Sequence, residues 1–96
     1  MSEVLEQVGD SPNVVGAGVA RHASAEGCQF VVEGGRFVVG QRLGFTLGNS
    51  REIRGAIRWL LGDRIGFAFD AAISREDLQE LTRLQRSHVP VRLLGY

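Results

Sequence analysis

The chain has no lysine, one cysteine, two prolines and no long apolar run, and these shortages exclude several classes of protein. Because Cys28 is the only cysteine, no disulfide can form within the chain, which excludes a disulfide-stapled secreted scaffold. No apolar run approaches the roughly 18 residues of a membrane-spanning helix. The N-terminus is acidic, unlike a secretory signal. We therefore expect a cytoplasmic protein that does not insert into a membrane.

Positive charge is scarce at the N-terminus although the chain as a whole has a net charge of zero. Residues 1–20 carry Glu3, Glu6 and Asp10 and no arginine, whereas residues 21–69 are rich in arginine. This middle region could attract a phosphate, but it is not the continuous basic surface that duplex nucleic acid requires. A single-strand binder needs exposed aromatic rings, and here the Phe and Trp residues fall on predicted inner faces. We expect no nucleic-acid polymer as a partner.

What is abundant is glycine, with 13 residues, and most of these glycines separate short apolar runs between about residue 14 and residue 70. This pattern is typical of small antiparallel barrels. We expect a single domain, mainly β, in which residues 14–70 form an antiparallel barrel of about six strands. The predicted strands are NVVGAGVAR, CQFVV, RFVVG, RLGFTL, EIRGAIRWLL and RIGFAFD. Residues 1–12 are expected to be flexible or to form a short helix.

The last two predicted strands specify a register. Ile53, Ile57 and Trp59 point to one face of the first strand, and Ile65 and Phe67 point to one face of the second. Two odd-numbered sets can share one face only if the loop between the strands has an odd length. We therefore predict a three-residue loop made of Gly62, Asp63 and either Leu61 or Arg64. Trp59 would then lie opposite Phe67 or Ile65.

A helix over residues 75–87 is predicted after the strands. Ser74 is the expected N-cap, with Asp77 at the third helical position. Three leucines, Leu78, Leu81 and Leu84, form a narrow apolar stripe. The tail VPVRLLGY is apolar enough to dock either on the barrel or against another subunit.

Residue types that carry catalysis or hold metals do not gather in this sequence. There is no nucleophile elbow, phosphate-binding loop or His-Glu-x-x-His motif. Two distant histidines, His22 and His88, make a poor metal site, and Cys28 is interpreted as a small buried hydrophobic residue. We expect a protein that is not an enzyme and that has no metal and no cofactor.

From Val19 to Phe69 the order of features resembles the PilZ domain, a small β-barrel with a C-terminal helix found in bacterial cyclic-di-GMP signalling. The resemblance rests on HASAEGCQF, on VGQRLGFTL leading to IRGAIRWLLGDRIGFAF, and on the helix that starts after Ser74. It implies one PilZ-like domain over residues 1–96, with the barrel and helix described above.

The family's ligand signature has two parts, an Arg-x-x-x-Arg loop near the N-terminus and a later (Asp/Asn)-x-Ser-x-x-Gly. Ser24 and Gly27 match the second part, while His22 stands where the family has Asp or Asn. The first part is missing, because residues 1–20 contain no arginine. Arg54 and Arg58 have the right spacing but fall within a predicted strand, so they are interpreted as solvent-facing arginines.

Two roles follow from this resemblance. In the first, the barrel is degenerate in its ligand motif and acts as a protein-interaction or oligomerisation module. Its predicted contacts with an unknown protein or a second copy are Leu81, Leu84 and Leu93. In the second, the chain is a cyclic-di-GMP receptor that binds weakly through Arg21, His22, Ser24 and Gly27. Arg36, Arg42 or a second chain are the further replacements for the missing pair. We place the first role ahead because two charge-assisted contacts are missing.

Overall fold

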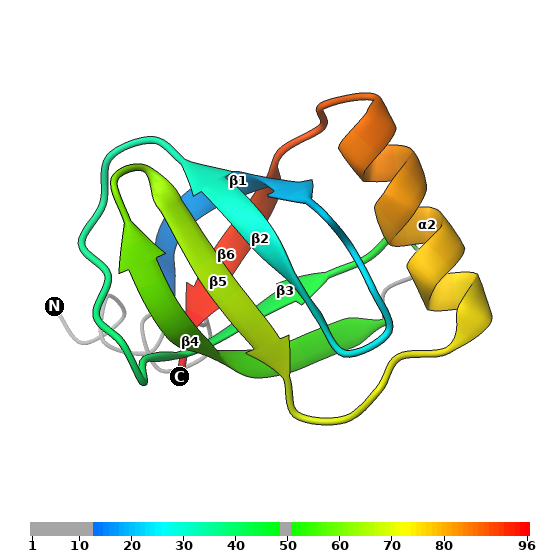
Figure 1. Cartoon of the computed structure of the whole chain (residues 1–96), viewed down its shortest axis with the longest axis horizontal. Helices are drawn as coiled ribbons and strands as arrows, with labels where there is room; N and C mark the ends of the chain where they lie inside the picture. Colours follow the sequence, from blue (N-terminus) through cyan, green and yellow to red (C-terminus); the bar gives the residue numbers. More distant parts are fainter. Residues whose placement is uncertain (1–12, 49–50) are drawn as a thin grey trace, which may run out of the picture.

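The computed structural model of the chain describes residues 13–48 and 51–96, which form a closed antiparallel barrel with one helix beside it (Figure 1). The strand order around the barrel is β1-β2-β5-β4-β3-β6. The predicted fold class is confirmed. The elements along the chain are β1 (Asn13–Arg21), β2 (Gly27–Val32), β3 (Arg42–Thr46), β4 (Glu52–Leu61), β5 (Arg64–Phe69), α2 (Arg75–Arg86) and β6 (Val91–Gly95).

The strand that closes the barrel is β6, which the sequence analysis treated only as an apolar tail. It pairs with β1 on one side and with β3 on the other. Residues 36–40, predicted as a strand, instead belong to a loop that joins β2 to β3. That prediction was wrong because the segment bends before it can pair: Gly34 and Gly35 have positive φ, and Gln41 N donates to Val38 O at 3.1 Å.

The core lies inside the barrel and continues under the helix. Alternating residues of each strand point inward, as expected for a sheet with one buried face. Five phenylalanines take part, four of them in a network of edge and tilted ring contacts. Cys28 is buried among them, in agreement with its interpretation as a packing residue.

Helix α2 covers one end of the barrel beside β1. Ser74 is its N-cap, as predicted: the Ser74 hydroxyl accepts a hydrogen bond from Asp77 N at 3.1 Å. The helix ends at Arg86, one residue before the predicted end. Figure 1 shows that the loop 33–41 and the β4–β5 turn lie at the opposite end of the barrel.

The β4–β5 hairpin differs from its predicted register. Its turn has two residues, Gly62 and Asp63, since Leu61 already pairs with Arg64. A bulge between Ile57 and Trp59 inserts one residue into β4, so the inward-facing set changes from odd to even numbers along that strand. Trp59 therefore lies opposite Gly66 and not opposite Phe67 or Ile65, and 39% of its surface is exposed. The prediction that all Phe and Trp side chains face inward fails for Trp59.

The expected flexible or short helical segment 1–12 lies outside the described residues. Within residues 13–48 and 51–96, no helix is both long and apolar enough to cross a membrane. The same part of the chain holds no cluster of His, Cys, Asp or Glu side chains with the size and spacing of a metal site.

Candidate functional site

The loop that joins β1 to β2, residues 22–26, is closed by its own serine. Ser24 N donates to Gly27 O at 2.9 Å, and the Ser24 hydroxyl donates to the same carbonyl at 3.2 Å. Glu26 N in turn donates to the Ser24 hydroxyl at 3.3 Å. Such local side-chain bonds replace the backbone pairing that a turn gives up. Ser24 therefore holds the loop in shape even without a ligand.

The two flanks of this loop are fixed to different parts of the molecule. Ala23 N donates to the Gln85 side-chain oxygen at 3.1 Å, which ties the loop to the last turn of α2. At the other flank, Phe69 N donates to Glu26 O at 2.9 Å, which ties it to the end of β5. His22 precedes these contacts with a φ of 54°, a conformation that few residues other than glycine adopt. The loop is thus pre-shaped, with the His22 side chain exposed.

Gly27 has a packing reason to be glycine. A Cβ at this position would meet the carbonyl oxygen and carbon of Phe67 on the neighbouring strand β5. Because those atoms are backbone, they could give way only by a shift of the sheet. The glycine of the motif is therefore required by the close approach of β2 to β5.

The loop opens onto a shallow groove of about 280 Å³ on the outer face of the barrel. One side of the groove is formed by His22, Ser24, Glu26 and Gly27. Arg58 and Trp59 of β4 form the other side, and residues of β2 and β5 form the floor. The groove therefore joins the predicted ligand loop to two residues that lie more than thirty positions later in the chain.

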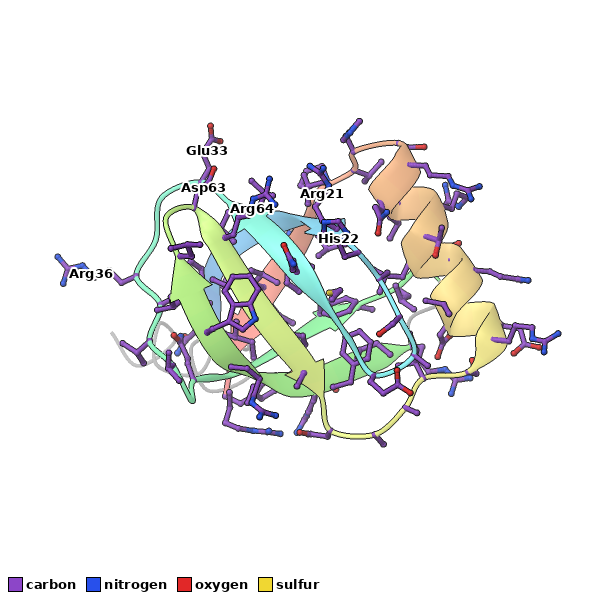
Figure 2. The ribbon with its side chains drawn as sticks, viewed as in Figure 1. Arg21, His22, Glu33, Arg36, Asp63 and Arg64 are labelled. Atoms are coloured by element: carbon purple, nitrogen blue, oxygen red, sulfur yellow. The ribbon has the colours of Figure 1, made fainter. Side chains whose placement is uncertain are left out.

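The register places Arg21 in the same outer row as Trp59. Arg21 pairs with Gln29, Gln29 pairs with Gly66, and Gly66 pairs with Trp59, so one row of side chains crosses β1, β2, β5 and β4. Figure 2 shows Arg21 and His22 close together at the edge of this surface. Neither Arg21 nor Arg58 forms an ion pair within the described part of the chain. Both guanidinium groups are therefore available to an anion.

The other arginines considered from the sequence lie away from this groove. The Arg54 guanidinium stacks over the Tyr96 ring at 4.1 Å and donates to Glu52, so Arg54 and Arg58 do not share one site. Arg42 donates to Asp70 at 2.7 Å with one nitrogen and contacts its second oxygen with the other. Arg36 projects from the far end of the barrel (Figure 2).

The three leucines predicted as partner contacts are divided by the fold. Leu81 and Leu93 are fully buried in the core. Leu84 is partly buried against the core and lines a second groove, of about 450 Å³, between α2 and the strands β3 and β6. Of the three, only Leu84 could be reached by a partner without opening the barrel.

Sequence reasoning missed Arg58 and Trp59 as members of the site. The signal that could have found them is the dipeptide Gly62-Asp63, which is typical of a two-residue hairpin turn. A two-residue turn pairs Trp59 with Gly66, and that even-numbered partner belongs to the outer face of β5. The apolar alternation in β4 pointed to the inner face because it continues across the bulge.

Comparison with known protein families matches residues 5–86 to the PilZ domain. No curated protein matches the chain. The family match covers the loop, the strands β2, β4 and β5 that form the rest of the groove, and the helix. The chain therefore belongs to the PilZ domain family, whose members are domains of cyclic-di-GMP signalling.

Proposed function

We propose that the groove beside residues 22–27 is a reduced nucleotide site that binds cyclic-di-GMP with low affinity. The observation that supports this most is the meeting of His22, Ser24 and Gly27 with Arg58 and Trp59 around one groove. Without Arg58 and Trp59 beside it, the loop would be only a turn between two strands. The added arginine and aromatic ring provide the two kinds of contact that a guanine nucleotide needs, a cation for phosphate and a flat apolar surface for the base.

Each side chain has a distinct part in this proposal. The exposed part of the Trp59 indole offers a stacking surface, a contact worth about 1–3 kcal/mol per base. Arg58 and Arg21 supply positive charge and form no ion pair within the described residues, while Glu26 of the loop is an acid that also lines the groove. Gln29, between Arg21 and Gly66 in the row, offers an amide that can both donate to and accept from a base edge.

The affinity is expected to be low because the arginine pair of the family signature is missing from residues 1–20. Two charge-assisted contacts of about 1.5–3 kcal/mol each correspond to at least two powers of ten in the dissociation constant. His22 lowers it further, since a neutral imidazole offers one acceptor where a carboxylate or an amide oxygen offers more.

Trp59 makes the test direct because it is the only tryptophan in the chain. We would follow its fluorescence during a titration with cyclic-di-GMP up to about 1 mM, the range in which weak complexes form. We expect a saturable change that weakens by about tenfold in Arg58→Gln, which removes one charge-assisted contact. Arg92→Gln is the matched control, since Arg92 is exposed on β6 and does not line the groove. No change up to the highest concentration, or equal losses in both variants, would contradict a nucleotide site here.

A second role, contact with another protein, is supported by a different observation. Val38, Val39 and Leu61 are 64%, 61% and 73% exposed, and all three belong to the barrel end opposite α2. Exposed apolar groups gathered on one face are typical of interaction surfaces. In this role the domain is non-enzymatic, needs no nucleotide and acts by binding a protein. This second role would be favoured over the first if Trp59 fluorescence did not change on titration with cyclic-di-GMP and the mass of the protein increased with protein concentration.

A further inference from the structure

The end of the barrel opposite α2 contains a groove that the nucleotide site does not use. Its volume is about 520 Å³. The apolar part of its lining comes from Val32, Phe37, Leu60 and Ile65, and Arg36 and Asp63 stand at its rim. Val32 and Ile65 are core residues, so the groove reaches the inner packing of the barrel.

Apolar side chains project from the chain immediately beside this groove. Val38 and Val39 directly follow Phe37, and a turn in which Gln41 N donates to Val38 O presents them to solvent. Leu61 directly follows Leu60 and is the most exposed large apolar residue in the described chain. One surface thus carries both a hollow and apolar projections that could fill such a hollow. This combination is what a two-fold interface requires, because each copy must present both halves of the contact.

The barrel end opposite α2 also carries acidic side chains on one side and a basic side chain on the other. Val32 N donates to Asp63 O at 2.8 Å, which brings the β4–β5 turn beside the end of β2 and places Asp63 next to Glu33 (Figure 2). Arg36 projects from the other side of the same end. Within residues 13–48 and 51–96, none of these three side chains forms an ion pair, although Arg64 lies near the two acids.

We propose that this barrel end binds a second copy of the chain in a two-fold dimer. Val38, Val39 and Leu61 of each copy pack into the groove of the other, and Arg36 of each copy pairs with the Glu33 and Asp63 carboxylates of the other. Because the dimer is two-fold symmetric, this ionic contact forms twice, once at the Arg36 of each copy. The inference rests on the proposed role in protein contact and not on nucleotide binding, since Trp59 and Arg58 lie outside the residues that it uses.

The test is a charge exchange between two variants. We would measure the mass of the full chain by light scattering between about 5 and 500 µM, and expect it to double from the 10.5 kDa of one copy. Arg36→Glu and Asp63→Arg are each expected to weaken the dimer by about tenfold or more, because each places like charges together. An equimolar mixture of the two variants is expected to recover the dimer, because opposite charges then meet at both of its ionic contacts. Arg75→Glu, on the exposed surface of α2, is the matched charge-reversal control.

Several results would overturn the proposal. A single-copy mass at every concentration would mean that the groove is covered by another part of this chain or by a different protein. Unchanged dimers in both charge variants, or a mixture that stays monomeric, would remove the ionic contact from the interface. Circular dichroism and Trp59 emission would show that each variant is folded. A dimer that does not change Trp59 emission on titration would contradict only the nucleotide site, and a nucleotide-binding monomer would contradict only the dimer.

Discussion

The indole of Trp59 lies over the backbone of Gly66, its partner across the β4–β5 ladder. A Cβ built on Gly66 would collide with the indole ring, so no other residue fits at this position with the ring in place. The same arrangement recurs at Gly44, whose Cβ would meet the Tyr96 ring at 2.7 Å. In both places an aromatic ring covers a strand glycine, an arrangement that protects an otherwise exposed ladder. Trp59 also shapes the candidate groove, so Gly66 controls the site indirectly.

Gly66→Ala should therefore lower stability and displace the indole. We expect a loss of about 1–3 kcal/mol in the free energy of unfolding, because the added methyl overpacks a rigid contact. Urea denaturation followed by circular dichroism measures that loss, and a red shift of Trp59 emission reports the displaced ring. Gly48→Ala is the control: its Cβ would meet only the flexible end of Glu80 at 3.0 Å, so stability should change little. Equal stability and emission in the two variants would contradict the contact.

The parts of the fold that follow from local pattern could be predicted from the sequence. The N-cap Ser74 begins a helix whose leucines recur every third residue and so lie on one helical stripe, and the inward set Cys28, Phe30 and Val32 follows strict alternation. These signals act over a few residues and do not depend on distant partners. The helix and strand β2 were accordingly predicted within one residue of the observed ends.

The parts that depend on partners far along the chain could not be predicted in this way. Residues 36–40 have the composition of a strand, but β6 takes the place beside β3 and pairs there with Leu43 and Gly44. Only the closed barrel shows that the tail is needed as a strand. The candidate site was predicted for the loop alone, because the bulge that turns Trp59 outward is a small local defect in a regular apolar pattern.

Gly27→Ala should disturb the fold whether or not a nucleotide binds. Its Cβ would collide with the Phe67 carbonyl, so β2 and β5 would have to separate at this point. We expect a loss of about 1–3 kcal/mol in the free energy of unfolding, in the range of other overpacking changes. Chemical denaturation of the ligand-free protein measures it. Ser24→Ala, which removes only exposed local hydrogen bonds, is the comparison and should cost about 1 kcal/mol or less. If Gly27→Ala were the milder of the two, the packing explanation for this glycine would be wrong.

Asp70 should titrate at lower pH than an isolated aspartate. The hydrogen bonds from the Arg42 guanidinium hold the pKa of Asp70 below its usual value, and the charges of Arg42 and Arg54 act in the same direction. A carboxyl with a lowered pKa in the folded state stabilises the protein above its unfolded pKa, and this contribution is lost as the pH falls through the lowered value. Carbon-detected NMR of the Asp70 carboxyl would measure the titration. In Arg42→Gln the pKa should rise towards the ordinary value, and a titration that is the same in both proteins would exclude the pair in solution.

Cys28 should not react as a nucleophile in the folded protein. It should also lower the free energy of unfolding as the pH rises into the alkaline range. Burial raises the pKa of its thiol to about 12, so the thiolate is almost absent near neutral pH. The folded chain then holds a proton that the unfolded chain releases from about pH 9, so the free energy of unfolding should fall by about 1.4 kcal/mol per pH unit between pH 9 and the raised pKa. A disulfide reagent should therefore label Cys28 only in denaturant. Cys28→Ala should show a shallower loss of stability over the same pH range. Rapid labelling of the native protein at pH 8, or identical pH profiles for the two proteins, would mean that β2 opens and exposes the thiol far more often than this packing allows.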